Sequence, residues 1–403
     1  MRSHGRLHVL SGAALAALGF LASGGPGPAA QAASAAPAPP AVDPALVQAD
    51  NALGRELFRR LRQGDPGRNL LVSPASAAKA LQLTCNGARG ATRDGMARAL
   101  GIQALEPDAL NAANRALLAA LAPDEENVTL AVANAIWQDG SQVLPAFADL
   151  TRNAYGAELG DLSGGLQAVN AWMARTTHGL ITRIVDPAQP VEPQALLLAN
   201  SVYFRATWSA PFDPGLTATA PFTRVDGSQV PCRLMVQTLA LDYGEDSHYQ
   251  AALLPYGKRR YAMLLVLPKP GAALADLEPV LRGRPAGLEP HSVVLRLPRF
   301  AAAFSGALDD HLAAMGMALA FDPDRADFSA LAPSRHHITS VAHATRISVD
   351  ERGTVAGAGT VVSMSGTCLP ELEMNLDRPF LYAILDRRTS EMIFLGQLGD
   401  PSR

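Results

Sequence analysis

Cysteine and histidine are the residues of this chain best suited to nucleophilic or metal chemistry, and their spacing matches no familiar site. Cys85, Cys232 and Cys368 lie far apart, without a CxxC pair or a neighbouring pair of histidines. His336 and His337 are adjacent, so a helix or a strand would point them in different directions. An odd number of cysteines also cannot all pair within one chain. We therefore expect no metal site and no cofactor.

Motifs of common enzymes are also missing from the sequence. The nucleophile-elbow pattern GxSxG does not occur, and GDLSGG at 160–165 has a different spacing. Neither HExxH nor a phosphate-binding P-loop is present. Asp309 and Asp310 resemble a carboxylate pair on a helix face, but no partner acid can be identified for them. We therefore expect that the protein is not an enzyme.

The most unusual stretch is DERGTVAGAGTVVSMSGTCLP at 350–370, which has no charged residue after Arg352. A buried unpaired charge would be costly, and proline, which is absent from 353–367, would remove a donor from a strand ladder. Fifteen such residues would make a strand of about 50 Å. One face of that strand would present only small or β-branched side chains, those of Thr354, Ala356, Ala358, Thr360 and Val362. The stretch is therefore predicted to be a loop that can become a buried strand.

The composition indicates a folded globular protein without a nucleic-acid partner. The 403 residues are 48% hydrophobic and 18% charged, enough to bury the core of one large domain or two ordinary ones. The formal net charge is -3, and no basic stripe suited to phosphate neutralisation is present. A protein or small-molecule partner is therefore expected.

The N-terminus has the features of a secretory signal peptide, which we place at residues 1–32. A basic start is followed by VLSGAALAALGFLA, an apolar run too short to span a bilayer, and then by small-residue cleavage triplets at 30–32 and 33–35. A Pro/Ala linker follows at 33–42. An uncleaved membrane anchor is the alternative. We expect a secreted or periplasmic protein without a membrane span.

From residue 43 onward the pattern predicts a single α+β domain, 43–403, with helices mainly in the first half and strands mainly in the second. Apolar residues at helical spacing predict helices at 43–63, 74–85, 91–100, 107–122, 144–155 and 166–179. Apolar and β-branched runs predict strands at 128–138, 194–204, 261–268, 292–300, 337–350, 379–385 and 391–398.

Four separated blocks of the chain, in the right order, resemble the serpins. They are residues 69–101, 196–213, 340–359 and 374–401, and the most specific is MNLDRPF at 374–380. The resemblance covers the chain from about residue 43 to the C-terminus. It implies helices packed around three β-sheets, with an exposed reactive-centre loop at about 351–370.

The resemblance also implies a mechanism, irreversible inhibition of a serine protease. The protease attacks the loop and forms an acyl-enzyme, and the cleaved loop inserts into a sheet as a strand before water releases the protease. Small hinge residues suit rapid insertion, although Val355 replaces the glutamate that is common in the family. The hinge residues implied are Glu351, Gly353, Thr354, Ala356, Gly357, Ala358, Gly359 and Thr360.

Counting along the loop places the reactive bond at Thr367–Cys368, with Cys368–Leu369 as an alternative and Met364–Ser365 as a third possibility. A small uncharged residue on the acyl side suits a shallow specificity pocket and excludes a trypsin-like target. The expected partner is therefore an elastase-like or subtilisin-like serine protease, held in a covalent complex.

Other residues match family positions that let the sheet open. Ser73, Ser76, Asn200 and His343 resemble a polar cluster beneath the centre of the sheet, and Trp208 resembles the aromatic residue where the loop begins to insert. Glu351 and Arg299 are expected to form an ion pair at the same end.

Two other functions stay open. One is a non-inhibitory serpin that acts as a carrier or chaperone, and the other is an inhibitor of a papain-like cysteine protease. The hinge lacks the bulky, charged or proline residues that would favour the first of these. We expect a monomer that is liable to polymerise by insertion of the loop into a sheet.

Overall fold

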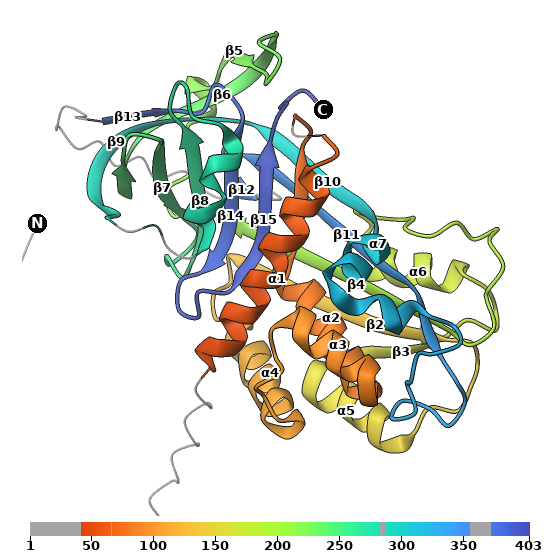
Figure 1. Cartoon of the computed structure of the whole chain (residues 1–403). Helices are drawn as coiled ribbons and strands as arrows, with labels where there is room; N and C mark the ends of the chain where they lie inside the picture. Colours follow the sequence, from red (N-terminus) through yellow and green to blue (C-terminus); the bar gives the residue numbers. More distant parts are fainter. Residues whose placement is uncertain (1–41, 66, 283–284, 286, 355–371) are drawn as a thin grey trace, which may run out of the picture. The chain divides into compact units, whose positions relative to one another are not determined.

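The computed structural model describes residues 42–403, except residue 66, residues 283–284, residue 286 and residues 355–371 (Figure 1). The predicted signal peptide, 1–32, lies outside the described residues, as does the predicted linker, 33–42, up to its last residue.

Helices form where they were predicted, with ends that differ by a few residues. Proline opens α1, α2, α4 and α5 at a position where its missing N–H leaves no helix hydrogen bond unmade. The side chains of Asp43 and Ser73 cap α1 and α2 by accepting from backbone N–H groups at 2.9 and 3.3 Å. The helices are α1 (Pro44–Arg62), α2 (Pro74–Gly87), α3 (Gly90–Leu100), α4 (Pro107–Leu121), α5 (Pro145–Tyr155) and α6 (Gln167–Thr176).

Shorter helical segments occur later in the chain and were not predicted. They are η1 (Pro214–Leu216), η2 (Leu274–Arg282), α7 (Asp309–Leu312), η3 (Ala313–Met317) and η4 (Ala318–Phe321).

The larger of the two sheets is built around the long strand β6. The C-terminal end of β6 pairs with β7, and earlier residues of β6 pair with β5 and β9. Through β6, two of the three sheets that the resemblance implied are joined into one. The strands are β1 (Leu70–Val72), β5 (Ala218–Thr223), β6 (Gln229–Glu245), β7 (Tyr249–Pro255), β8 (Tyr261–Pro268), β9 (Glu289–Pro298), β13 (Leu372–Asn375), β14 (Phe380–Asp386) and β15 (Met392–Leu398).

The second sheet has the order β10-β11-β12-β4-β2-β3. Its two longest strands, β4 and β11, also pair directly with each other in parallel, from Ala195 with His337 to Val202 with Thr345. We call this β4–β11 boundary the seam. The strands are β2 (Val128–Gln138), β3 (Glu158–Asp161), β4 (Ala195–Thr207), β10 (Phe300–Ala307), β11 (His337–Asp350) and β12 (Gly353–Thr354).

One strand prediction was wrong in its extent. The run 292–300 was expected to be a single strand, but β9 ends at Pro298, and Phe300 opens β10 in the other sheet. Proline ends the regular ladder, and the one residue between the strands lets the chain change sheets.

The half-exposed strands β5 and β6 were missed because their side chains alternate imperfectly between buried and exposed positions.

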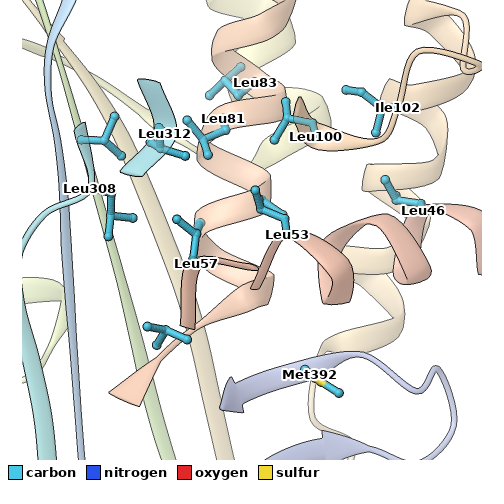
Figure 2. Close-up of a cluster of buried hydrophobic side chains, with 14 of the residues drawn as sticks. Leu46, Leu53, Leu57, Leu81, Leu83, Leu100, Ile102, Leu308, Leu312 and Met392 are labelled. Carbon is cyan, nitrogen blue, oxygen red and sulfur yellow. The ribbon is translucent and has the colours of Figure 1, made fainter. Parts of the chain in front are cut away.

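Alternate residues of β4 face two different cores. Leu196 and Leu198 belong to the cluster that contains α1, α2 and α3, whereas Leu197 and Ala199 pack in the cluster of α6. Figure 2 shows leucines of the first cluster, including Leu53 and Leu57 of α1, pointing toward α2 and α3. The seam is therefore covered on both faces over this part of its length.

The central helix α2 also buries charge. Lys79 Nζ lies 2.6 Å from Asp50 Oδ2 of α1 and 3.8 Å from Glu391 Oε1, and all three side chains are 0% exposed. Gln82 Nε2 donates to the other Asp50 oxygen at 2.6 Å. Asp386, which forms an ion pair with Arg260, also acts on Glu391 through its charge. Burial raises the pKa of Glu391 well above its ordinary value; the charge of Lys79 lowers this pKa in part, whereas the charges of Asp50 and, to a smaller extent, Asp386 raise it further.

Glu391→Gln should stabilise the protein increasingly as the pH rises. Between the ordinary carboxyl pKa and the raised one, the folded protein holds one more proton than the unfolded chain, so the free energy of unfolding falls with rising pH. Glutamine removes this loss, which amounts to about 1.4 kcal/mol per pH unit within the window. Urea unfolding midpoints at pH 4 and pH 8 would measure the difference. A gain of equal size at both pH values, or destabilisation at pH 8, would contradict the prediction. Glu373→Gln, at an exposed carboxylate paired with Arg296, is the control.

Candidate functional site

The first residues of the predicted reactive-centre loop lie inside the second sheet. After β11 the chain turns at Glu351–Arg352, and the carboxylate of Asp350 accepts from the N–H groups of Arg352 and Gly353 at 2.8 and 3.3 Å. The next two residues form β12, which pairs antiparallel with β11 on one side and with β4 on the other. The first residues of the predicted hinge therefore already occupy the upper end of the seam.

Gly353 is required at this position by the space around it. Its φ is +152°, and a Cβ atom there would lie 2.0 Å from the carbonyl oxygen of Ala206 in β4. Thr354 follows with its side chain fully buried, opposite Ala206 on one side and Val349 on the other. A larger residue at 353 would push β12 out of the seam.

The predicted ion pair is present at this turn. Arg299 Nε donates to Glu351 Oε1 at 2.6 Å, and Thr217 Oγ1 donates to the same oxygen at 2.5 Å. Burial alone would raise the pKa of Glu351, but these hydrogen bonds from Thr217 and Arg299 lower it. Glu351 is thus held as a carboxylate at the point where the loop leaves β11. The role of Thr217 was missed because no sequence pattern connects it to Glu351.

Trp208 lies beside the turn at Glu351–Arg352. Its indole Nε1 donates to the carbonyl oxygen of Asp350 at 2.9 Å, and its backbone N–H donates to that of Arg352 at 2.9 Å. The ring stacks on Tyr256 with centroids 4.3 Å apart. Trp208 therefore supports the turn that starts the loop.

The structure also brings together Ser73, Ser76, Asn200 and His343, which we call the seam cluster. Ser73 N donates to His343 Nε2 at 3.1 Å, and His343 Nδ1 is hydrogen-bonded to Asn200 Oδ1 across the seam. Ser76 Oγ reaches Asn134 Oδ1 at 3.4 Å, and also the Ser201 carbonyl oxygen. A ring that accepts at Nε2 and donates at Nδ1 is a neutral imidazole. Sequence reasoning missed Asn134 and Ser201, which are ordinary strand residues by pattern.

The other candidate residues have separate surroundings. His336 Nε2 lies 3.4 Å from Asp139 Oδ1, whereas His337 Nε2 lies 3.9 Å from a carboxylate oxygen of Glu192. Cys85 and Cys232 are buried free thiols, and burial raises the pKa of Cys85 to about 11. Within the described ranges, no group of three or more His, Cys, Asp or Glu side chains is arranged to hold a metal ion.

Asp309 is half-buried and makes a structural hydrogen bond. Its Oδ1 accepts from the backbone N–H of Val341 at 2.6 Å, which ties the start of α7 to β11.

No helix among residues 42–403, outside the gaps named above, is both long and apolar enough to cross a membrane.

Several predicted positions lie outside the described residues. They are the hinge positions Ala356, Gly357, Ala358, Gly359 and Thr360, and the candidate reactive bonds Thr367–Cys368 and Cys368–Leu369.

His343 should make the protein sensitive to acid. Burial lowers the pKa of His343 to about 3, so between pH 6.5 and 3 the unfolded chain binds the extra proton and the free energy of unfolding falls as the pH falls. The loss approaches about 1.4 kcal/mol per pH unit in this window.

Urea midpoints between pH 7.5 and pH 5 would test this contribution with His343→Gln. The variant should be less stable than the parent at pH 7.5, because the bonds to Ser73 and Asn200 are disturbed, and the difference should shrink toward pH 5. A constant difference across this range would show that His343 does not carry the acid sensitivity. His248→Gln, at an exposed histidine, is the matched control.

Comparison with known proteins covers nearly the whole described chain. The family model for serpins, described as serine protease inhibitors, matches residues 48–401. A putative serpin-Z12 of Oryza sativa subsp. japonica is 32% identical over 87% of this chain and 90% of its own length. Serpin B8 of Homo sapiens is 29% identical over 88% of this chain and 99% of its own length.

A solved structure gives the same result. The native state of tengpin, a thermophilic serpin, is 28% identical, covers 90% of this chain and 95% of its own, and superposes with a TM-score of 0.78. The family model, the relatives and the solved structure agree with one another on the family and the fold. The chain belongs to the serpins, a family of protease inhibitors rather than enzymes.

Proposed function

We propose that the protein is an irreversible inhibitor of an elastase-like or subtilisin-like serine protease. The seating of β12 in the seam is the observation that carries this proposal. The alternatives, a non-inhibitory carrier or an inhibitor of a cysteine protease, have no comparable support in the described residues.

The geometry supports insertion of the rest of the loop as a strand. β12 already runs antiparallel to both β4 and β11, and below it these two strands pair only with each other at the seam, in parallel. A loop strand that continues from Thr354 into the seam would separate β4 from β11. Their parallel pairing with each other would be lost, and each of them would instead pair with the loop in an antiparallel ladder. Antiparallel ladders are slightly more stable per residue, so insertion would run downhill once the seam opens. The uninserted state would then be kinetically rather than thermodynamically stable.

The chemistry needs no catalytic group from this chain. The serine of the target protease would attack the carbonyl carbon of Thr367, the peptide bond to Cys368 would break, and the amine of Cys368 would leave with the C-terminal segment. The acyl ester would remain between Thr367 and the protease. Insertion would carry the attached protease along and distort it before water hydrolyses the ester.

The seam cluster would govern the opening of the sheet. The bond between His343 and Asn200 joins β11 to β4, and Ser73 at the start of α2 holds the other side of the imidazole. All three side chains are essentially buried, so these bonds must break in a site with little access to water. We propose that the cluster keeps the seam closed until the loop is cleaved.

The same proposal includes export. Residues 1–32 would be removed as a signal peptide, residues 33–42 would form a linker, and residues 43–403 would act outside the cytoplasm as a monomer that is liable to loop–sheet polymerisation. The uncharged, proline-free loop is the reason for this liability, since such segments pair readily with strand edges.

Mixing the mature protein with elastase, subtilisin, trypsin and papain would test the function. We expect a complex that survives denaturing gels with elastase or subtilisin, and release of a C-terminal peptide whose mass begins at Cys368. A complex with papain alone would support the cysteine-protease alternative. Cleavage of the loop by every protease without a trapped complex would overturn the inhibitory function in favour of a carrier or chaperone.

Gly353→Ala should turn the inhibitor into a substrate. The added Cβ would meet the Ala206 carbonyl oxygen at 2.0 Å, so the hinge could not take its place beside β4. The reactive bond should still be cleaved, but the covalent complex should fall by at least about fivefold relative to cleaved product, as for a clash of about 1–3 kcal/mol. Gly164→Ala is the matched control, because nothing lies within 4 Å of a Cβ there. Unchanged trapping by Gly353→Ala would contradict this part of the proposal.

A further inference from the structure

The buried side chain of Thr354 has a specific partner outside the sheet. Its Oγ1 shares a hydrogen bond of 2.6 Å with the hydroxyl of Tyr256, which follows β7 in the larger sheet. Both side chains are 0% exposed. The contact therefore links the first inserted residue of the loop to a part of the molecule that lies outside the seam.

The ring of Tyr256 is held rigidly. It stacks on Trp208 at an interplanar angle of 15°, and the edge of Phe204 contacts it with centroids 5.3 Å apart. The backbone N–H of Tyr256 donates to Tyr261 at 2.9 Å and its carbonyl oxygen accepts from Arg259 at 2.7 Å, which fixes the turn that carries it. The phenol is thus placed in advance at one position, where the hydroxyl of residue 354 arrives.

We propose that Tyr256 is a positioning residue for loop insertion, because its hydroxyl holds Thr354 in the seam so that insertion starts from a strand already begun. The inference rests on the proposed inhibitory function. It assigns to Tyr256 a part in the competition between insertion and hydrolysis of the acyl-enzyme, and none in recognition of the protease.

The two states of the loop respond differently to loss of this hydroxyl. In Tyr256→Phe, the hydroxyl of Thr354 would be buried without its partner. Before cleavage, the described part of β12, Gly353–Thr354, can withdraw from the seam to hydrate that hydroxyl. In the inserted strand Thr354 would be fixed by the residues that follow it and could not withdraw. Insertion should therefore slow while the exposed part of the loop remains available to the protease.

The test compares Tyr256→Phe with a matched control, Tyr382→Phe. Tyr382 is also 0% exposed and lies in the same core cluster, but its hydroxyl has no hydrogen-bond partner within the described residues. We expect Tyr256→Phe to raise the number of inhibitor molecules consumed per trapped protease about fivefold, as one lost hydrogen bond would. The rate of association with the protease should not fall. Tyr382→Phe should change neither quantity by more than about twofold.

Removing both hydroxyls provides a rescue experiment. Thr354→Val has nearly the same shape as threonine, so in Tyr256→Phe/Thr354→Val no polar group is left unpaired at this contact. We expect the double variant to consume fewer inhibitor molecules per protease than either single variant. An effect of Tyr256→Phe below about twofold, an equal effect of Tyr382→Phe, or additive effects in the double variant would each overturn the inference.

Insertion can also be followed without inhibition, which separates this inference from the proposed function. Cleavage of the loop in the purified protein should be followed by a gain in heat stability as the loop inserts, and Tyr256→Phe should delay that gain relative to Tyr382→Phe. If the parent traps no protease but gains heat stability after cleavage, only the inhibitory function fails. The role of Tyr256 is then supported if Tyr256→Phe delays this gain relative to Tyr382→Phe, and is overturned if it does not. If the parent shows neither, both are overturned.

Discussion

The parallel pairing of β4 with β11 is the interaction on which the rest of this structure depends. It closes the seam from Ala195 with His337 to Val202 with Thr345, and farther along β12 lies between the same two strands, opposite Ala206 and Val349. A parallel ladder is the weaker kind, and here it occupies the place where two antiparallel ladders could form. A sheet with this boundary is what the proposed insertion of the loop requires, because a weaker parallel ladder would be exchanged for two antiparallel ones.

The proposed insertion requires contacts across the seam that hold β4 and β11 together in the uncleaved protein and can break when the loop enters. The seam cluster satisfies this by joining β11, β4 and α2 through a neutral imidazole, without a buried charge at the boundary itself. An ion pair would be harder to separate, because each partner would be left as a buried charge. At the upper end, Glu351 and Arg299 do form such a pair, beside the turn, where Arg299 keeps access to water. An ion pair thus lies at the end of the loop that stays in place, and neutral polar groups lie at the boundary that opens in the proposed mechanism.

The helical core gives the seam a support that need not move with it. α2 packs against α1, β2, β4 and β15, so one helix touches both sheets. Its first turn carries Ser73 and Ser76, which reach the seam, and its next turn carries Lys79, which is paired deep in the core with Asp50. Removal of one partner from such a buried pair leaves an uncompensated charge. The position of the cluster beneath the seam is therefore tied to a helix that a buried ion pair holds in the core.

The sequence by itself determined the six longer helices and most of the longer strands, though not β6, because periodicity and caps are local properties. The absence of charge and proline after Arg352, also a local property, predicted a loop that can become a strand. The motifs that resemble serpins also indicated Ser73, Ser76, Asn200, His343 and Trp208 as residues of the site. Only the tertiary structure decided that Asn134, Ser201, Thr217 and Tyr256 complete it. These residues come from strands and turns distant in the sequence, and their patterns are those of ordinary core positions. Their roles arise from cross-strand register and from the meeting of two sheets, which no single stretch of sequence contains.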